Sequence, residues 1–235
     1  MKKFYLFLTI IATSLCLVGC GDKEKPADKS SEYMEESNAE ASDTTETVSS
    51  EIMYGNILSL YKKALSEEWE YDVLIENNLN YMCYYHNHRG TGPEDIGYTF
   101  YDINSDGIEE LIVGEIEGLI FDVYTYQNEQ AILIAQSGER GWYNICEDGK
   151  LSQQGSNGAA TTFYLFYVLE AGAKELKHIE CVAFDSNLNP DNPYFYTTKG
   201  PGVDYTQIDE ETADNIMAKY KVVNIDKLTP FAQYN

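Results

Sequence analysis

Apolar side chains recur at helical spacing early in the folded part of the chain and at strand spacing later. From Glu51 onward, apolar residues recur at spacings of three and four residues, at Tyr54, Ile57, Leu58, Tyr61, Ala64 and Leu65. This arrangement is typical of one face of a helix. A second helical segment is expected from Tyr71 to Tyr84, with Asn77-Asn78 as a candidate break, and residues 86–93 are predicted to be a loop.

After Pro93 the chain becomes a series of short runs rich in Tyr, Phe, Ile and Val, separated by turn signals such as Asp106-Gly107 and Asp148-Gly149. The predicted strands are Ile96–Tyr101, Glu110–Glu115, Leu119–Gln127, Ala131–Gln136, Trp142–Cys146, Lys150–Gln154, Thr161–Glu170 and Leu176–Phe184. Turns this short join neighbouring antiparallel strands as hairpins. The strands are therefore expected to form a meandering, mostly antiparallel sheet.

The rest of the chain adds one helix. Residues 185–204 are rich in Pro, Asn and Asp and are predicted to be an irregular loop. A last helix is expected to begin after Asp209, whose side chain is a candidate N-cap. The predicted fold class is α+β, with N-terminal helices and one C-terminal helix packed on the meandering antiparallel β-sheet. We expect a single domain over residues 51–235.

The first twenty residues have the pattern of an export signal. Lys2-Lys3 gives a positive start, and residues 4–18 form an apolar run too short to be a spanning helix. The sequence Leu17-Val18-Gly19-Cys20 resembles the lipobox of bacterial lipoproteins. This resemblance implies cleavage before Cys20 and a lipid on its sulfur. The alternatives are an ordinary signal peptide and an uncleaved anchor.

The lipobox divides the N-terminal region into two parts. Residues 1–19 are the expected signal peptide. Residues 20–50 are then a lipidated cysteine followed by an acidic tether, which has few large apolar side chains and is expected to be disordered. The expected location is the outer face of the bacterial cytoplasmic membrane, with the membrane as a partner through the lipid on Cys20.

The charge balance limits the partners of the chain. Its 235 residues include 16 Lys and Arg against 39 Asp and Glu, a formal net charge of −23 at pH 7. Such a surface repels nucleic acid and favours divalent cations. Beyond the signal, Cys83, Cys146 and Cys181 remain for the folded domain. They allow either one disulfide with a free thiol or three buried thiols, and their spacing fits no zinc site.

Oxygen-bearing side chains alternate along one turn between two predicted strands. Counted from Asp102, they fall at positions one, three, five and nine, which are Asp102, Asn104, Asp106 and Glu110. The backbone carbonyl of Ile108 lies at position seven, and Gly107 at position six permits a sharp turn. Calcium takes roughly six to eight oxygen ligands in flexible geometry. We therefore predict a structural calcium site at these five positions, the alternative being an acidic hairpin that binds no ion.

The pattern D-x-N-x-D-G-x-x-E-L-I-V-G resembles the strand–loop–strand calcium loops of FG-GAP/VCBS repeats. It differs from an EF-hand, because Val113 stands at position twelve and the flanking sequence is of β type. The resemblance implies that Glu110 ligates the ion directly. The wider chain is similar to a group of bacterial surface lipoproteins, a similarity that implies no activity. It is carried by Tyr101–Gly114, Cys146-Glu147-Asp148-Gly149 and Gly155-Ser156-Asn157-Gly158-Ala159.

The sequence contains no familiar catalytic signature, such as a G-x-S-x-G elbow, an H-E-x-x-H motif or a P-loop. His86 and His88 are expected to be solvated loop histidines, with a metal pair as the alternative. The 20 tyrosines are expected to fill the core, the alternative being an exposed aromatic face for a glycan or protein ligand.

Taken together, these patterns favour a membrane-anchored extracytoplasmic lipoprotein with a calcium-stabilised domain that acts as a binding module. No catalytic residue is assigned. The alternative is an extracytoplasmic hydrolase acting on a cell-wall or polysaccharide substrate, whose paired carboxylates cannot be chosen from so acidic a sequence.

Overall fold

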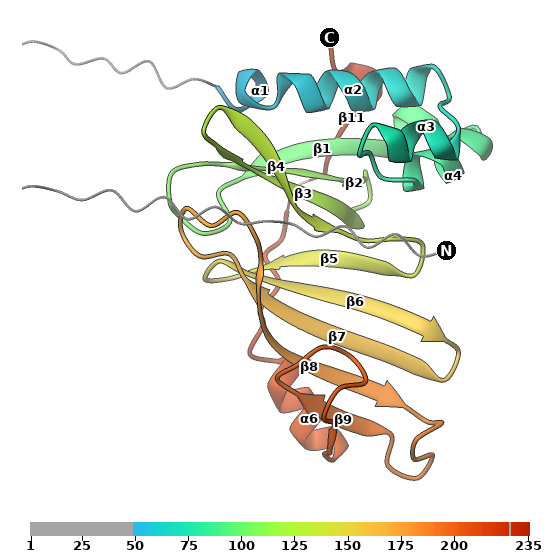
Figure 1. Ribbon diagram of the computed structural model, residues 1–235, viewed down its shortest axis with the longest axis vertical. Helices are drawn as coiled ribbons and strands as arrows, with labels where there is room; N and C mark the ends of the chain where they lie inside the picture. The colour runs from blue at the N-terminus through green and yellow to red at the C-terminus, as the bar shows by residue number, and fades with distance from the viewer. Residues whose placement is uncertain (1–48, 226) are drawn as a thin grey trace, which may run out of the picture. The chain divides into compact units, whose positions relative to one another are not determined.

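The computed structural model describes residues 49–225 and 227–235. The predicted signal peptide, the lipidation site Cys20 and the tether up to residue 48 lie outside these residues. Within the described part of the chain, no helix is long and apolar enough to cross a membrane. The predicted α+β fold class is confirmed, because helices flank one mostly antiparallel sheet (Figure 1).

The eleven strands found among the described residues belong to one sheet. They are β1 (Ile96–Tyr101), β2 (Glu110–Glu115), β3 (Ile120–Gln127), β4 (Gln130–Gln136), β5 (Gly141–Cys146), β6 (Lys150–Gly158), β7 (Thr161–Val168), β8 (Lys177–Asp185), β9 (Tyr194–Thr197), β10 (Thr206–Gln207) and β11 (Thr229–Pro230). The order is β10-β9-β8-β7-β6-β5-β3-β2-β1-β11, with β4 on β3 outside this path. All of these pairs are antiparallel.

The meander is interrupted once. The β3–β4 hairpin pairs along most of its length, whereas β3 and β5 pair only at Ile120 and Tyr143. This short contact joins the first strands to β5–β10. On one face, a buried cluster spans the junction and includes Ile112, Val123 and Ile145.

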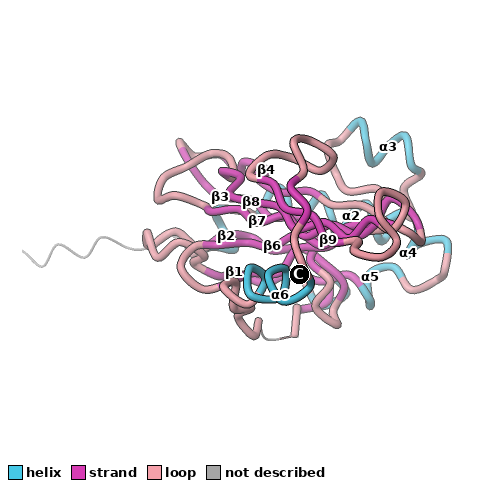
Figure 2. Tube along the Cα trace, turned by 90° about the horizontal axis from the view of Figure 1, so that it is seen from below, coloured by secondary structure: helices cyan, strands magenta, loops and turns pink. Residues whose placement is uncertain are grey.

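In the part of the chain that the structure describes, five short helices precede the sheet and pack on its first strands. They are α1 (Ser50–Met53), α2 (Gly55–Ser66), α3 (Tyr71–Glu76), α4 (Met82–His88) and α5 (Gly92–Asp95). The face of α2 predicted from the apolar spacing is buried, with Leu58 and Tyr61 fully inaccessible. It packs in one cluster with Tyr98 and Leu111 of the sheet. Figure 2 shows the cyan helices around the magenta strands.

The last helix, α6 (Glu210–Met217), packs through Ala213 and Ile216 on a cluster that includes Phe166 and Val182. Its predicted N-cap is confirmed, because the Asp209 carboxylate accepts a hydrogen bond from the Thr212 backbone N–H at 2.8 Å. Near the C-terminus, β11 pairs with β1 and is followed by the 3₁₀ helix η1 (Phe231–Gln233).

Several local predictions were wrong. Residues 86–93 are not a loop, because α4 continues to His88 and α5 begins at Gly92. The segment 185–204 is not wholly irregular, because it contains β9. These elements are four to seven residues long, too short to show a hydrophobic period. Cys83, Cys146 and Cys181 are buried and free, as the buried-thiol alternative expects.

Figure 1 shows that successive connections lie alternately at the two ends of the strands. The β1–β2, β3–β4, β5–β6 and β7–β8 connections lie at one end, on the left of Figure 1. The β4–β5, β6–β7 and β8–β9 connections lie at the other end. The predicted calcium loop is the β1–β2 connection and therefore belongs to the first group.

Candidate functional site

The oxygen loop, residues 102–110, joins the last residue of β1 to the first of β2, because Tyr101 and Glu110 are paired. Two of its residues have positive φ, namely Ser105 at 58° and Gly107 at 88°. Gly107 tolerates this conformation without the steric cost that a side chain would add. The strand–loop–strand arrangement is as predicted, with β-strands and not helices on both sides.

The side chains at positions one, three and five fold onto the loop itself. Asp102 accepts hydrogen bonds from the backbone N–H groups of Asp106 and Gly107, at 3.1 and 3.0 Å. Asp106 accepts from the Ile108 N–H at 3.0 Å and from the Asn104 amide at 3.0 Å. A carboxylate oxygen has more than one lone pair, so these contacts leave acceptor capacity for a cation.

Glu110 at position nine points inward. It is fully buried, and its two carboxylate oxygens accept from the Ile103 backbone N–H at 2.9 Å and the Thr125 hydroxyl at 3.1 Å. Burial raises the pKa of Glu110 to about 7, the two hydrogen bonds oppose this, and the charges of Asp106 and Asp102 add to it. Glu110 is therefore a buried carboxylate close to two others.

The oxygen loop also contacts other connections at the same end of the sheet. The Gly172 backbone N–H donates to Asp106 at 3.0 Å, and the Asn104 amide donates to the Glu170 carbonyl at 3.4 Å. The Gln127 amide at the end of β3 donates to the Ala173 carbonyl at 3.2 Å. The β1–β2 loop and the β3–β4 hairpin are thus both tied to the β7–β8 connection, which no spacing in the sequence indicated.

A calcium ion fits the chemistry of this donor set. The loop offers carboxylates, one amide oxygen and a backbone carbonyl, all hard oxygen ligands. No Lys, Arg or His of the described residues forms an ion pair with Asp102, Asp106 or Glu110. Over residues 49–225 and 227–235, no three His, Cys, Asp or Glu side chains are grouped to hold a metal. An ion would therefore also need the oxygens of Asn104 and Ile108.

A second buried carboxylate, Asp122 on β3, was not singled out from the sequence. It is fully buried and accepts hydrogen bonds from the Tyr61 hydroxyl and from the Asn80 amide, the latter at 2.8 Å. Burial raises the pKa of Asp122 to about 7, and these hydrogen bonds act in the opposite direction. The network fixes α2 and the start of α4 on the sheet, and its burial gives substrate no access to the carboxylate.

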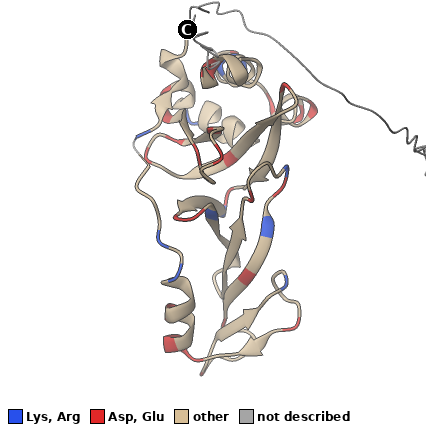
Figure 3. Cartoon of the chain, turned by 90° about the vertical axis from the view of Figure 1, so that its left-hand side faces the viewer, with Lys and Arg blue, Asp and Glu red and all other residues tan. Residues whose placement is uncertain are grey.

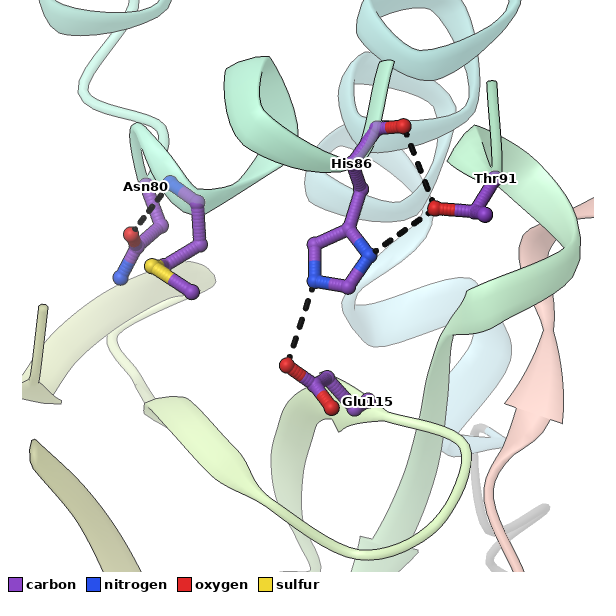
Figure 4. A network of polar contacts seen from close by, with 5 residues as sticks. Asn80, His86, Thr91 and Glu115 are labelled. Carbon is purple, nitrogen blue, oxygen red and sulfur yellow. Dashed lines mark hydrogen bonds and ion pairs between the residues drawn. The ribbon is translucent and has the colours of Figure 1, made fainter. Parts of the chain in front are cut away.

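His86 differs from its prediction as a solvated residue, because it is only 5% exposed. Its Nε2 lies 3.2 Å from Oε1 of Glu115 on β2, and its Nδ1 lies 3.4 Å from the Thr91 hydroxyl. Figure 4 shows the ring between these two partners. His88 is exposed and its Nδ1 lies 3.0 Å from the Tyr84 carbonyl, so the two histidines do not share a metal-binding face.

No family model and no curated protein matches the chain. Its structure is similar to that of a solved Xanthomonas protein described as related to a type IV secretion system. The sequence identity is 20%, the TM-score is 0.33, and the similarity covers 49% of this chain and 58% of that chain. The chain thus spans little more than half of that neighbour, and a likeness at this level carries no argument about function.

Proposed function

We propose that this chain is a lipid-anchored binding module on the outer face of a bacterial cytoplasmic membrane. One calcium ion, held by Asp102, Asn104, Asp106, Ile108 and Glu110, would stabilise its folded domain. The ion has a structural role, and the ligand of the module is a glycan or a protein.

The observation that supports the calcium site most directly is the uncompensated negative charge at the oxygen loop. Glu110 is fully buried beside two aspartates, and no described cationic side chain contacts any of the three. Burying a charge without a partner is costly. A divalent cation would remove this cost. Because Asp106 and Asn104 also contact the β7–β8 connection, it would stabilise more than the loop.

The test is the melting temperature of the domain from residue 49 onward, with and without calcium. At a calcium concentration about 100 times Kd, binding contributes about 2.7 kcal/mol, which raises Tm by about 5–10 °C for a domain of this size. Asp106→Ala should abolish the rise. Glu109→Gln is the matched control, because Glu109 is an exposed acid in the same loop and lies outside the ligand set. It should keep the rise.

Magnesium provides a second control. It prefers six ligands in strict octahedral geometry and should raise Tm less than calcium at the same concentration. The proposal is wrong if calcium changes neither Tm nor the heat measured in a titration, or if Asp106→Ala keeps the full rise.

Anchoring is tested separately by cell fractionation of the full chain. Cys20→Ser should release the protein from the membrane fraction, because it removes the sulfur that carries the lipid. Cys16→Ser lies within the apolar run and should leave the protein anchored. Retention of the Cys20→Ser variant in membranes would contradict the lipoprotein assignment.

A further inference from the structure

Three adjoining hollows lie at the end of the sheet opposite the oxygen loop. The first, of about 360 Å³, is lined by Met82, Tyr85, Arg89, Glu115, Glu139 and Arg140. The second, of about 340 Å³, shares Glu139 and Arg140 with the first. The third, of about 290 Å³, shares Phe163 with the second. Shared walls place the three hollows in a row from α4, past the β4–β5 connection, to the start of β7.

The first hollow contains both arginines of the 235-residue chain. Arg89 follows α4, and Arg140 lies in the β4–β5 connection, so the fold brings them together from separate elements. Both are exposed, and neither forms an ion pair with a described residue. Basic residues are outnumbered in this chain, with 16 Lys and Arg against 39 Asp and Glu, and Figure 3 marks the two kinds along the chain in blue and red.

The two carboxylates of the same hollow do not pair with the arginines. Glu115 lies 3.2 Å from Nε2 of the buried His86 (Figure 4), and Glu139 forms no ion pair with a described residue. The guanidinium groups of Arg89 and Arg140 are therefore open to a carboxylate from a ligand. A guanidinium binds a carboxylate through two parallel hydrogen bonds.

Aromatic rings line the rest of the row. Tyr81 lies in the second hollow, Phe163 in the second and third, and Tyr205 in the third. The Phe163 ring lies on Gly155 of β6, where a Cβ atom would come within 2.3 Å of the ring. Gly155 thus allows the ring to lie against the backbone of the sheet. Residues with hydroxyl and amide side chains, including Gln153 and Thr162, are also among the lining residues.

This combination of groups favours a sugar chain over a peptide. Sugar rings pack on aromatic side chains, and their hydroxyls pair with amides and hydroxyls. An extended peptide would bind best along an open strand edge. The strands bordering the row, β6, β7 and β8, are each paired on both sides.

We propose that the row of hollows is a groove for an acidic glycan, with carboxylates held by Arg89 and Arg140 and sugar rings packed on Phe163 and Tyr205. This inference rests on the proposed function as a binding module and specifies the ligand class. The net charge of −23 makes binding of a polyanion elsewhere on the surface unfavourable, so the two arginines should dominate the interaction.

The test is a printed array of acidic and neutral glycans probed with the folded domain, followed by calorimetric titration of the strongest binder. We expect uronic-acid-containing glycans to bind above neutral ones. Arg89→Gln and Arg140→Gln should each weaken binding about tenfold, the effect of one lost charge-assisted contact. Phe163→Ala should also weaken it. Lys177→Gln removes an exposed positive charge outside the groove and should leave binding unchanged.

Binding to no acidic glycan, or binding that survives both arginine substitutions, would overturn the groove assignment. Inorganic phosphate and an acidic peptide are titrated in parallel as other sources of negative charge. If the phosphate or the peptide binds more tightly than the glycan, the groove assignment is also wrong. The rise in Tm with calcium is measured on the same preparation. A preparation that shows this rise but binds no glycan would contradict the groove and leave the calcium proposal standing. Peptide binding would leave the binding module in place while rejecting the glycan.

Discussion

The fully buried carboxylate of Asp122 makes the stability of this domain depend on pH. Its pKa is raised to about 7, chiefly because burial disfavours the charged form. The folded state therefore holds a proton that the unfolded chain releases at lower pH. As pH rises from about 4 through 7, stability falls, and above 7 this contribution levels off.

The substitution Asp122→Asn tests whether this carboxylate causes the fall in stability with rising pH. The amide is neutral at every pH, so the variant should lose the part of the pH slope that Asp122 causes. For a pKa that moves from 3.8 to about 7, this part is on the order of 4 kcal/mol as an upper limit. Urea unfolding at pH 5 and pH 8 covers the part between pH 5 and the pKa of about 7, which is on the order of 2.7 kcal/mol. An unchanged slope in Asp122→Asn would mean that Asp122 is not protonated on folding.

Among single residues, the sequence pointed to those of the loop between β1 and β2, and it did not point to Asp122. Alternating oxygens and one glycine identify Asp102–Glu110 because the relevant contacts are local. The partners of Asp122 are Tyr61 and Asn80, which are 61 and 42 residues away. Nothing in the spacing of the chain relates these positions, since only the packing of α2 and of the segment between α3 and α4 on β3 brings them together.

The structural elements differ in how far the sequence determined them. The strands β1–β8 were predicted with most ends within one or two residues, because apolar runs and tight turns alternate clearly there. The main exception is β6, which continues to Gly158 through polar residues that carry no strand signal. The strands β9, β10 and β11 have four residues or fewer, too few to show a hydrophobic period, and were missed.

The C-terminal tail shows what such a missed element contributes. Phe231 is fully buried and packs against Tyr61 of α2 and Tyr98 of β1, with ring centroids 5.5 and 5.2 Å apart. Phe231→Ala should lower the free energy of unfolding by about 3–5 kcal/mol. Val222→Ala, at a 60% exposed position in the preceding segment, should change it by less than about 0.5 kcal/mol. Chemical denaturation compares the two, and equal small effects would contradict this role for the tail.

At the scale of the whole described domain, the two ends of the strands have different proposed roles. The end with the oxygen loop connects β1–β2, β3–β4 and β7–β8 through polar contacts and is the proposed calcium end. The opposite end carries the arginines and the row of hollows. Sequence spacing suggested the first end and gave no indication of the second, because Arg89 and Arg140 meet only through the fold.

The central claim is that calcium at Asp102–Glu110 fastens separate parts of the sheet to one another. Hydrogen exchange of backbone amides, with and without calcium, tests it most directly. We expect calcium to slow exchange in the oxygen loop and also at Gly172, whose N–H donates to Asp106 from the β7–β8 connection. The Asp106→Ala variant should show neither effect. Protection confined to the loop, or no change at Gly172, would contradict the claim.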